Sequence, residues 1–147
     1  MKYILLIDLF LISGCSITGS IISEPKLEGP FIVTKVVDGD TLDLNNSLRI
    51  RMSGINTPET GECYYAEAKK ELSKTTLNKE VYLEKDITDK DKYERYLRYI
   101  YIDNNSVNNF LVENGFARVY DKYEKDTKRY KELKKFEEKA KQKLLGV

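Results

Sequence analysis

The sequence of 147 residues contains no histidine, and this absence removes several classes of active site. There is no imidazole to act as a general base near neutral pH or to ligate zinc. The only cysteines are Cys15 and Cys63, and two thiols do not complete a zinc site by themselves. Any catalytic chemistry must therefore rest on carboxylates, arginine, lysine, tyrosine and amides, with or without a hard metal ion that prefers oxygen ligands.

The sequence also lacks an excess of charge of either sign, because its formal net charge is only +1. A binding site for a polyanion must therefore come from local clustering of basic side chains. Apolar residues make up 41% of the chain and charged residues 33%, which is typical of a soluble globular domain with a heavily charged surface. The length is sufficient for one domain with a hydrophobic core.

The first 15 residues have the pattern of a secretory signal peptide. A lysine precedes the apolar run 4–12, which is shorter than the roughly 20 residues of a membrane-spanning helix. After the run, residues 12–15 resemble a bacterial lipobox, in which the cysteine, here Cys15, becomes the lipidated first residue. An ordinary cleaved signal peptide, or a tail packed on the domain, is the alternative, and Asp8 within the run is unfavourable for export. We expect a linker over 16–30 and one domain over 31–147.

Short apolar and β-branched runs alternate with turn residues in the remaining chain. They predict strands at residues 31–37, 41–44, 48–52, 81–84 and 97–102. Helical spacing of apolar residues predicts helices over 62–77, 107–114 and 126–144. Five short strands with an inserted helix predict an α+β domain dominated by a five-stranded OB-fold barrel with about three helices.

Two segments carry candidate chemistry. Asp38 and Asp40 flank a glycine between the first two strands, which by itself is also the pattern of an ordinary tight turn. Arg51, on the third strand, precedes a loop with an amide, a hydroxyl and a carboxylate at Asn56, Thr57 and Glu59. This second pattern alone is also that of a helix entry with a proline and a threonine cap.

Together the two segments provide the groups that phosphodiester hydrolysis requires. Carboxylate, amide and carbonyl oxygens suit calcium, and an arginine fork matches the oxygens of a phosphate. A metal, an arginine and a carboxylate can neutralise the phosphate, stabilise charge in the transition state and activate water.

Five segments in one order extend this pattern along the chain: VVDGDT, RIRMSGINTPE, EAKKEL, DKYERYLRYIY and VNNFLVENGFARVY. In this order the chain resembles the staphylococcal-nuclease-like, or thermonuclease, family from residue 31 to the last helix. The resemblance implies a calcium-dependent endonuclease that cleaves DNA and RNA with little sequence preference and leaves 3′-phosphates. We expect a monomer that contacts the membrane only through its lipid anchor.

The resemblance also assigns roles to individual positions. It implies metal ligands at Asp40, Asn56 and the carbonyl of Thr57. It implies catalytic roles for Arg51, Arg95 and Glu59, the last of which activates water. It implies substrate contacts at Lys92, Tyr93 and Tyr123, with Asp38 in a supporting role.

Two positions depart from the family pattern. Asn56 stands where a second calcium-binding aspartate is usual, so the site loses one negative charge. Glu94 stands where a glycine is usual, and we expect it to pair with Arg95 or Lys92. The first departure keeps open an alternative, a catalytically impaired OB-fold lipoprotein that binds nucleic acid. A surface adhesin that uses the charged last helix as its partner face is a third possibility.

The N-terminal pattern generates the first testable prediction. When the full chain is expressed in a bacterial host with a radiolabelled fatty acid, we expect the label on the protein and the protein in the membrane fraction. Replacing Cys15 by serine should abolish both, because serine offers no thiol for lipid attachment, whereas Cys63→Ser should change neither. Unlabelled protein that keeps Met1 and stays in the cytosol would contradict the prediction.

Overall fold

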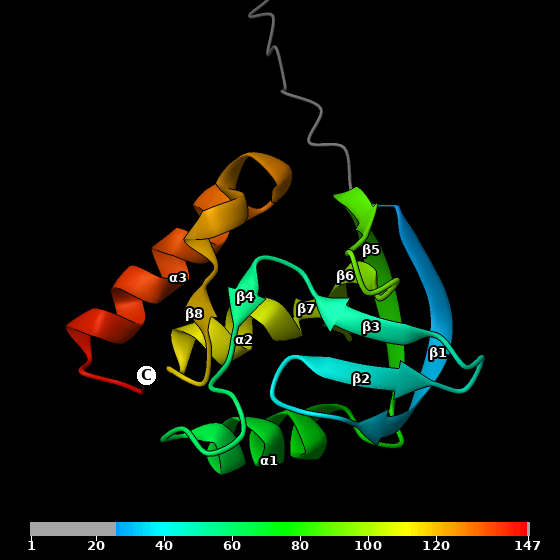
Figure 1. Ribbon diagram of the computed structural model, residues 1–147, viewed down its shortest axis with the longest axis horizontal. Coiled ribbons are helices and arrows are strands. Elements are labelled where there is room, and N and C mark those ends of the chain that lie inside the picture. The colour runs from blue at the N-terminus through cyan, green and yellow to red at the C-terminus, as the bar shows by residue number, and fades with distance from the viewer. Residues whose placement is uncertain (1–25, 147) are drawn as a thin grey trace, which may run out of the picture.

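The computed structural model describes residues 26–146 (Figure 1). The predicted signal peptide, the lipidation site at Cys15 and most of the expected linker therefore lie outside the described residues. Among the described residues, no helix combines the length and the apolar character needed to cross a membrane.

Five strands form the barrel that the sequence predicts. They are β1 (Leu27–Val36), β2 (Thr41–Leu44), β3 (Arg49–Met52), β5 (Glu80–Lys90) and β6 (Tyr96–Ile102). Antiparallel pairing runs in the order β3-β2-β1-β5-β6, and β3 then pairs with β6 in parallel to close the sheet on itself. The register of this closing pair sets Arg51 opposite Leu97, so the predicted catalytic strand lies at the seam of the barrel.

Three α-helices accompany the barrel, as predicted. They are α1 (Tyr65–Thr76), α2 (Val107–Glu113) and α3 (Tyr130–Gln142). In Figure 1 α1 lies below the barrel, and α2 and α3 lie to its left. The remaining elements are β4 (Ile55–Asn56), β7 (Asn105–Ser106), β8 (Arg118–Val119) and the 3₁₀ segment η1 (Asp121–Asp126). The α+β, OB-type barrel expected from the sequence is thus confirmed.

Several boundaries differ from the predictions. β1 begins at Leu27, so Leu27 and Glu28 of the expected linker pair with Glu84 and Leu83 of β5. β5 runs to Lys90 rather than ending at residue 84, because its far end pairs with the start of β6. The long helix expected over 126–144 starts only at Tyr130 and follows the separate segment η1. Two-residue strands such as β4 and β8 have no periodic pattern of their own and were not predicted.

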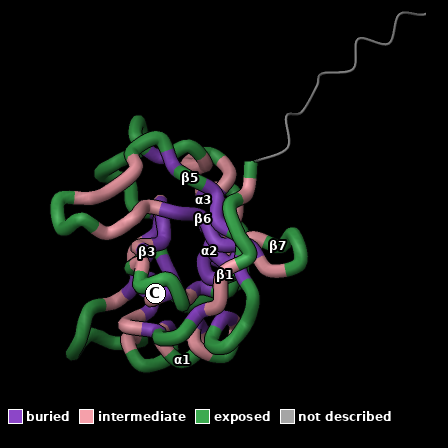
Figure 2. The backbone as a smooth tube through the Cα atoms, turned by 90° about the vertical axis from the view of Figure 1, so that its right-hand side faces the viewer, coloured by how far each residue is buried: buried purple, intermediate pink, exposed green. Residues whose placement is uncertain are grey.

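The core fills the barrel and the space between the barrel and the helices. Figure 2 shows the buried stretches gathered inside the molecule and the exposed stretches on its outer loops. Leu42, Ile50 and Met52 of the barrel are fully buried, as are Leu72 of α1 and Leu133 of α3. Burying such side chains contributes about 1.5–3 kcal/mol each, so apolar packing fixes the helices on the barrel.

A buried carboxylate joins the barrel to the start of α3. Glu84 on β5 is 2% exposed and accepts hydrogen bonds from Tyr101 Oη (2.8 Å), Lys128 Nζ (2.7 Å) and Arg129 Nε (2.6 Å). Burial acts to raise the pKa of Glu84, but these donors outweigh burial and lower it. Because a buried carboxylate is costly without partners, this network ties residues 128 and 129 to β5 and thereby positions η1.

Candidate active site

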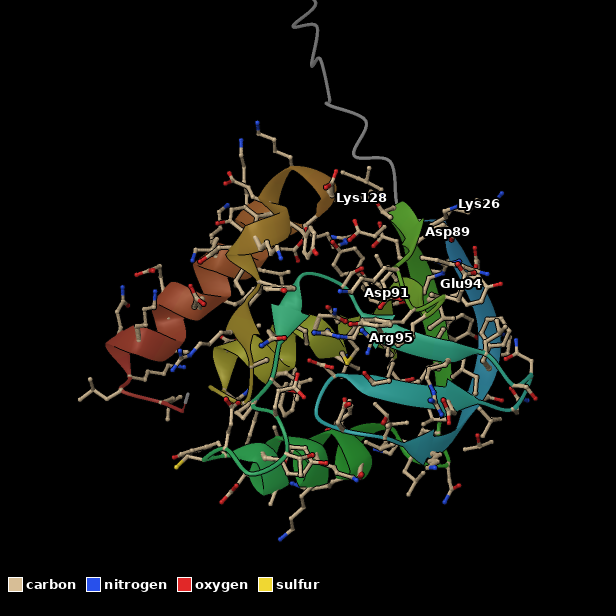
Figure 3. All side chains as sticks on the ribbon, viewed as in Figure 1. Lys26, Asp89, Asp91, Glu94, Arg95 and Lys128 are labelled. Atoms are coloured by element: carbon tan, nitrogen blue, oxygen red, sulfur yellow. The ribbon has the colours of Figure 1, made fainter. Side chains whose placement is uncertain are left out.

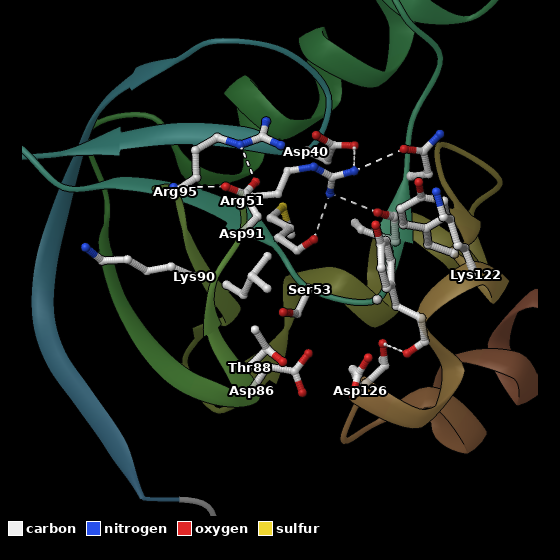
Figure 4. A pocket seen from close by; sticks show the side chains of 18 of the residues that line it. Asp40, Arg51, Ser53, Asp86, Thr88, Lys90, Asp91, Arg95, Lys122 and Asp126 are labelled. Atoms are coloured by element: carbon white, nitrogen blue, oxygen red, sulfur yellow. Dashed lines mark hydrogen bonds and ion pairs between the residues drawn. The ribbon is translucent and has the colours of Figure 1, made fainter. Parts of the chain in front are cut away.

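A cavity of about 520 Å³ opens where the β3–β4 loop, the β5–β6 hairpin and η1 meet (Figure 4). Among the described residues with a predicted role, all except Thr57 line this cavity. They are Asp38, Asp40, Arg51, Asn56, Glu59, Lys92, Tyr93, Arg95 and Tyr123. The fold therefore brings together residues that lie up to 85 positions apart in the sequence.

Asp40 is the most enclosed carboxylate of the cavity, at 5% exposure. Its Oδ2 accepts hydrogen bonds from the backbone N–H of Thr57 (3.0 Å) and from Thr57 Oγ1 (3.1 Å), and it pairs with Arg51 Nη2 at 2.9 Å. Its Oδ1 accepts from Thr41 Oγ1 at 3.1 Å. Thr57 thus orients Asp40 through its N–H and hydroxyl, a role that the sequence did not indicate.

Gly39 makes this arrangement possible. A Cβ atom at this position would lie 2.7 Å from Thr57 Oγ1 and 2.9 Å from the Cβ of Ala68 on α1. Any side chain would therefore push the Asp38-Gly39-Asp40 turn away from the loop that carries Thr57. The glycine between the two aspartates is required for close approach as well as for turn formation.

Arg51 lies at the centre of the cavity wall with its guanidinium almost fully paired. Nη1 donates to the carbonyls of Met52 (2.8 Å) and Ile55 (2.9 Å). Nη2 reaches Asp40 Oδ2 at 2.9 Å and Asn56 Oδ1 at 3.0 Å. Four of its five N–H groups therefore bind the chain's own oxygens, and Arg51 holds the β3–β4 turn together in addition to facing the cavity.

Arg95 has a different environment at the edge of the cavity. Its Nε donates to Asp91 Oδ2 at 2.7 Å, and Asp91 Oδ1 accepts the backbone N–H groups of Tyr93 and Arg95 (Figure 4). Nη1 and Nη2 of Arg95 form no hydrogen bond or ion pair within residues 26–146, and the guanidinium lies 5.5 Å from the ring centre of Tyr93. Both terminal nitrogens therefore keep their hydrogen-bonding capacity for a ligand. Figure 3 shows Asp91 and Arg95 together beside β3, with Glu94 farther out.

The expected pairing of Glu94 was wrong. Its carboxylate binds Lys90 Nζ at 3.0 Å, while Asp91 takes Arg95. Glu94 has a positive φ of 62°, as a tight β5–β6 hairpin requires, and this turns its side chain back towards Lys90 instead of towards Arg95. The acidic partner of Arg95 is therefore four residues before it, at a position that the sequence left without a role.

Glu59 is exposed on the loop after β4, and its carboxylate forms no hydrogen bond or ion pair with the described residues. Its backbone N–H donates to Glu62 Oε2 at 2.7 Å, which fixes the loop just before α1. The free carboxylate lines the same cavity as Arg51 and Arg95, so its oxygens are available to a water molecule.

Aromatic rings with neighbouring cations form the outer rim of the cavity. Tyr93 is 67% exposed and Tyr123 is 47% exposed. Lys92 lies 4.8 Å from the ring centre of Tyr93, and Lys122 lies 5.6 Å from that of Tyr123. Such pairs offer a flat surface for a nucleobase together with a positive charge for a phosphate.

The structure adds cavity residues that the sequence analysis missed. Tyr120 packs edge-to-face on Tyr123 with ring centres 5.2 Å apart, and both line the cavity. The sequence did contain a signal, since Tyr120, Lys122 and Tyr123 alternate aromatic and basic character. Ser53 also lines the cavity, and its buried Oγ has no partner among the described residues.

The donor set suits a cation with oxygen ligands. Asp40 Oδ2 and Asn56 Oδ1 converge on one positively charged nitrogen, Arg51 Nη2. They supply a single carboxylate, and no three aspartate, glutamate or cysteine side chains among residues 26–146 are arranged to hold a metal ion. A calcium ion held here would therefore depend on carbonyl and water oxygens in addition to Asp40.

Comparison with known proteins agrees with this geometry. The family model described as staphylococcal nuclease homologue matches residues 49–147. The chain is 37% identical over 123 residues to an SPbeta prophage-derived endonuclease of Bacillus subtilis (strain 168), a match covering 77% of this chain and 42% of that protein. It is 34% identical over 98 residues to an uncharacterized endonuclease of Haemophilus influenzae, covering 64% and 54% of the two chains. It is 32% identical over 126 residues to a thermonuclease of Staphylococcus hyicus, covering 80% and 73%. The chain thus spans about half the length of the first two relatives.

Asp40 provides a prediction that concerns stability alone. Burial raises the pKa of Asp40 to about 6, Arg51 opposes the rise, and Asp38 adds to it. Between about pH 4 and pH 6 the folded protein binds more protons than the unfolded chain, so Asp40 costs stability as pH rises through this window. In chelator, Asp40→Asn should therefore gain up to about 3 kcal/mol of unfolding free energy relative to wild type between pH 4 and pH 7.

Urea denaturation across this pH range measures the difference. Asp43→Asn is an opposite-sign control on the neighbouring strand, because a hydrogen bond from Arg49 lowers the pKa of Asp43. As pH rises, the unfolding free energy of wild type should increase relative to that of Asp43→Asn. A difference between Asp40→Asn and wild type that does not change with pH would contradict the prediction.

Proposed function

The chain belongs to the staphylococcal nuclease family, and on that premise we propose that it is a calcium-dependent endonuclease. It hydrolyses phosphodiester bonds of DNA and RNA with low sequence specificity and leaves 3′-phosphates. The observation that carries this proposal is the shared cavity. In it the free fork of Arg95 and the free carboxylate of Glu59 face the same space as the oxygen pair of Asp40 and Asn56.

Asp40, Asn56 and the carbonyl of Thr57 are the residues proposed to hold calcium. When bound, the ion would neutralise the phosphate and stabilise the charge that develops on it. The two hydrogen bonds from Thr57 keep Asp40 in place for this role. Asn56 contributes a neutral oxygen, so Asp40 supplies the only full negative charge in the set.

The two arginines bind the phosphate in unequal ways. Arg95 offers Nη1 and Nη2 as a ready fork, because only its Nε is used by Asp91. Arg51 can offer Nη2 to a phosphate only by giving up its contacts with Asp40 and Asn56, the residues proposed to hold the ion. Binding of a cation at those oxygens and binding of phosphate by Arg51 therefore favour each other.

Glu59 is the group proposed to orient a water molecule or to take its proton, because its carboxylate has no other partner in the described part of the chain. The water attacks phosphorus, and the bond to the 5′ oxygen breaks, so that the phosphate remains on the 3′ oxygen. Stacking on Tyr93 and Tyr123 accepts any base, which agrees with low sequence specificity.

An impaired nucleic-acid-binding protein remains the second candidate, because the proposed metal site has one carboxylate instead of two. We further propose that the domain acts outside the cytoplasm, held at the membrane by lipid on Cys15. Calcium at the concentrations found outside cells suits a weak site of this kind.

Degradation of plasmid DNA and of single-stranded RNA with calcium or with excess chelator tests the proposal. We expect cleavage of both substrates only with calcium. Arg95→Lys and Glu59→Gln should each lower turnover more than about a hundredfold, because lysine lacks the bidentate fork and glutamine cannot take a proton. The thermal unfolding midpoint should change little, because the Glu59 carboxylate has no partner among the described residues and a lysine at position 95 keeps a positive charge for Asp91.

Matched controls are Arg118→Lys and Glu67→Gln, which make the same changes at exposed positions outside the cavity. Arg51→Lys should also lower turnover, but it will reduce stability as well, because Arg51 binds two backbone carbonyls. Full activity in chelator would refute the calcium requirement. Binding without cleavage at any calcium concentration would favour the second candidate.

Asn56 allows a separate test of the metal site. Asn56→Asp adds a negative charge beside Asp40, so the calcium concentration for half-maximal activity should fall about tenfold from the millimolar range. Turnover at saturating calcium should stay within about twofold, because Asn56 moves no proton. A calcium titration at one pH measures both, with Asn46→Asp on the β2–β3 hairpin as the control of equal charge. An unchanged half-activation point would mean that Asn56 does not approach the metal.

A further inference from the structure

The active-site cavity is poorly suited to attract a polyanion by itself. Six carboxylates line it, from Asp38, Asp40, Glu59, Asp86, Asp91 and Asp126. Five cationic side chains line it, from Arg51, Lys90, Lys92, Arg95 and Lys122. Without a bound cation the cavity therefore carries slightly more negative than positive charge. With a net charge of +1, the chain as a whole does not compensate for this.

A second hollow, of about 570 Å³, lies next to the cavity where η1 meets the start of α3. Its charged walls come from Lys125, Lys128, Arg129, Lys131 and Lys135 on the positive side and from Glu124 and Glu132 on the negative side. Thr127 lines both hollows, so the two are separated only by this segment of the chain. We call this second hollow the α3 groove.

The internal ion pairs leave the positive charge of the α3 groove in excess. Lys128 and Arg129 both bind Glu84, and Arg129 also binds Glu132 at 2.7 Å, so two carboxylates balance these two cations. Three groove lysines, Lys125, Lys131 and Lys135, are exposed and form no ion pair within residues 26–146. Of the two groove carboxylates, Glu124 forms no ion pair with the described residues either. By contrast, the charges that line a third hollow, on β2 and β3, are balanced: Arg49 and Arg95 are positive, and Asp43 and Glu94 are negative.

From this charge distribution we infer that the α3 groove is a binding site for the phosphates of a nucleic-acid strand beyond the scissile bond. This inference rests on the proposed nuclease function and specifies how that substrate is held. A strand that leaves the cavity past Lys122 crosses η1 and meets three unpaired lysines. Lysines contact phosphates as point charges without reading bases, so the groove adds affinity for long strands and no sequence preference.

The position of the groove depends on the Glu84 network. Lys128 and Arg129 are tied to β5 at the base of the groove, and Figure 3 shows Lys128 at the end of η1 that faces β5. Lys125 on η1 and Lys131 and Lys135 on α3, on either side of residues 128 and 129, are thereby held around one hollow. Their positive charge does not depend on a metal, so this site binds strands even when the cavity holds no calcium.

Binding of a fluorescent single-stranded DNA of about 20 nucleotides in chelator tests the inference, because no cleavage occurs there. The groove variant combines Lys125→Gln, Lys131→Gln and Lys135→Gln. The control variant combines Lys35→Gln, Lys70→Gln and Lys143→Gln, which remove the same charge at exposed lysines off the groove. We expect the groove variant to bind at least tenfold more weakly at 50 mM salt, and the control to stay within about twofold of wild type.

The salt dependence provides a second readout. Three phosphate contacts to a single strand account for a slope of about −2 in log K against log salt, and the groove variant should lose about this much. With calcium, KM for a long strand should rise while kcat is kept, and cleavage of a dinucleotide, which lies within the cavity, should not change. Binding by the groove variant that equals the control would overturn the inference. If wild type cleaves nothing, the nuclease proposal fails while the binding comparison in chelator still decides the role of the groove.

Discussion

The ion pair between Arg51 and Asp40 is the interaction on which the rest of the cavity depends. Asp40 comes from the turn after β1, and Arg51 comes from β3 at the seam of the barrel. The same guanidinium binds the carbonyls of Met52 and Ile55, so it also sets the path of the loop towards Asn56. Because both partners are mostly buried, neither can lose the other without leaving an unpaired charge in a region of low dielectric constant.

This constraint gives Arg51 two tasks that compete for its N–H groups. In the absence of a cation it pairs with Asp40 and donates a hydrogen bond to Asn56 Oδ1. A divalent cation at these oxygens would take over that pairing and leave the guanidinium to a phosphate. On the proposed function, the limited number of donors on one side chain would link metal binding to substrate binding.

A second buried charge, Glu84, holds η1 and the start of α3 in place, as Arg51 holds the β3–β4 loop. It lies on β5, and its partners on residues 128 and 129 bring the end of η1 against the barrel. Gly54 makes room for this packing, because a Cβ there would lie 2.6 Å from Leu133 Cδ1 and 2.8 Å from Thr127 Cγ2. The tyrosines of the cavity rim and the lysines of the α3 groove both depend on this docking.

Strand patterns, turn residues and the order of five short segments were sufficient to predict the barrel, the helices and nine of the residues that line the cavity. The barrel and the helices follow from local periodicity, which can be read along a single chain. Asp40, Arg51 and Glu59 were indicated by residue types that suit one chemistry, whereas Arg95, Lys92, Tyr93 and Tyr123 were indicated only by the family resemblance. The elements that were missed, such as β4, β8 and η1, are short segments whose structure comes from their partners across the molecule.

Only the tertiary structure decided how the charges pair. The sequence indicated that Glu94 would bind Arg95 or Lys92, but the hairpin geometry directs Glu94 to Lys90 and gives Arg95 to Asp91. The sequence did not indicate that Thr57 would donate hydrogen bonds to Asp40 or that Glu84 would anchor the start of α3. Spacing along the chain limits which charges can meet. Which of them do meet depends on strand register and helix docking, and apolar burial determines both.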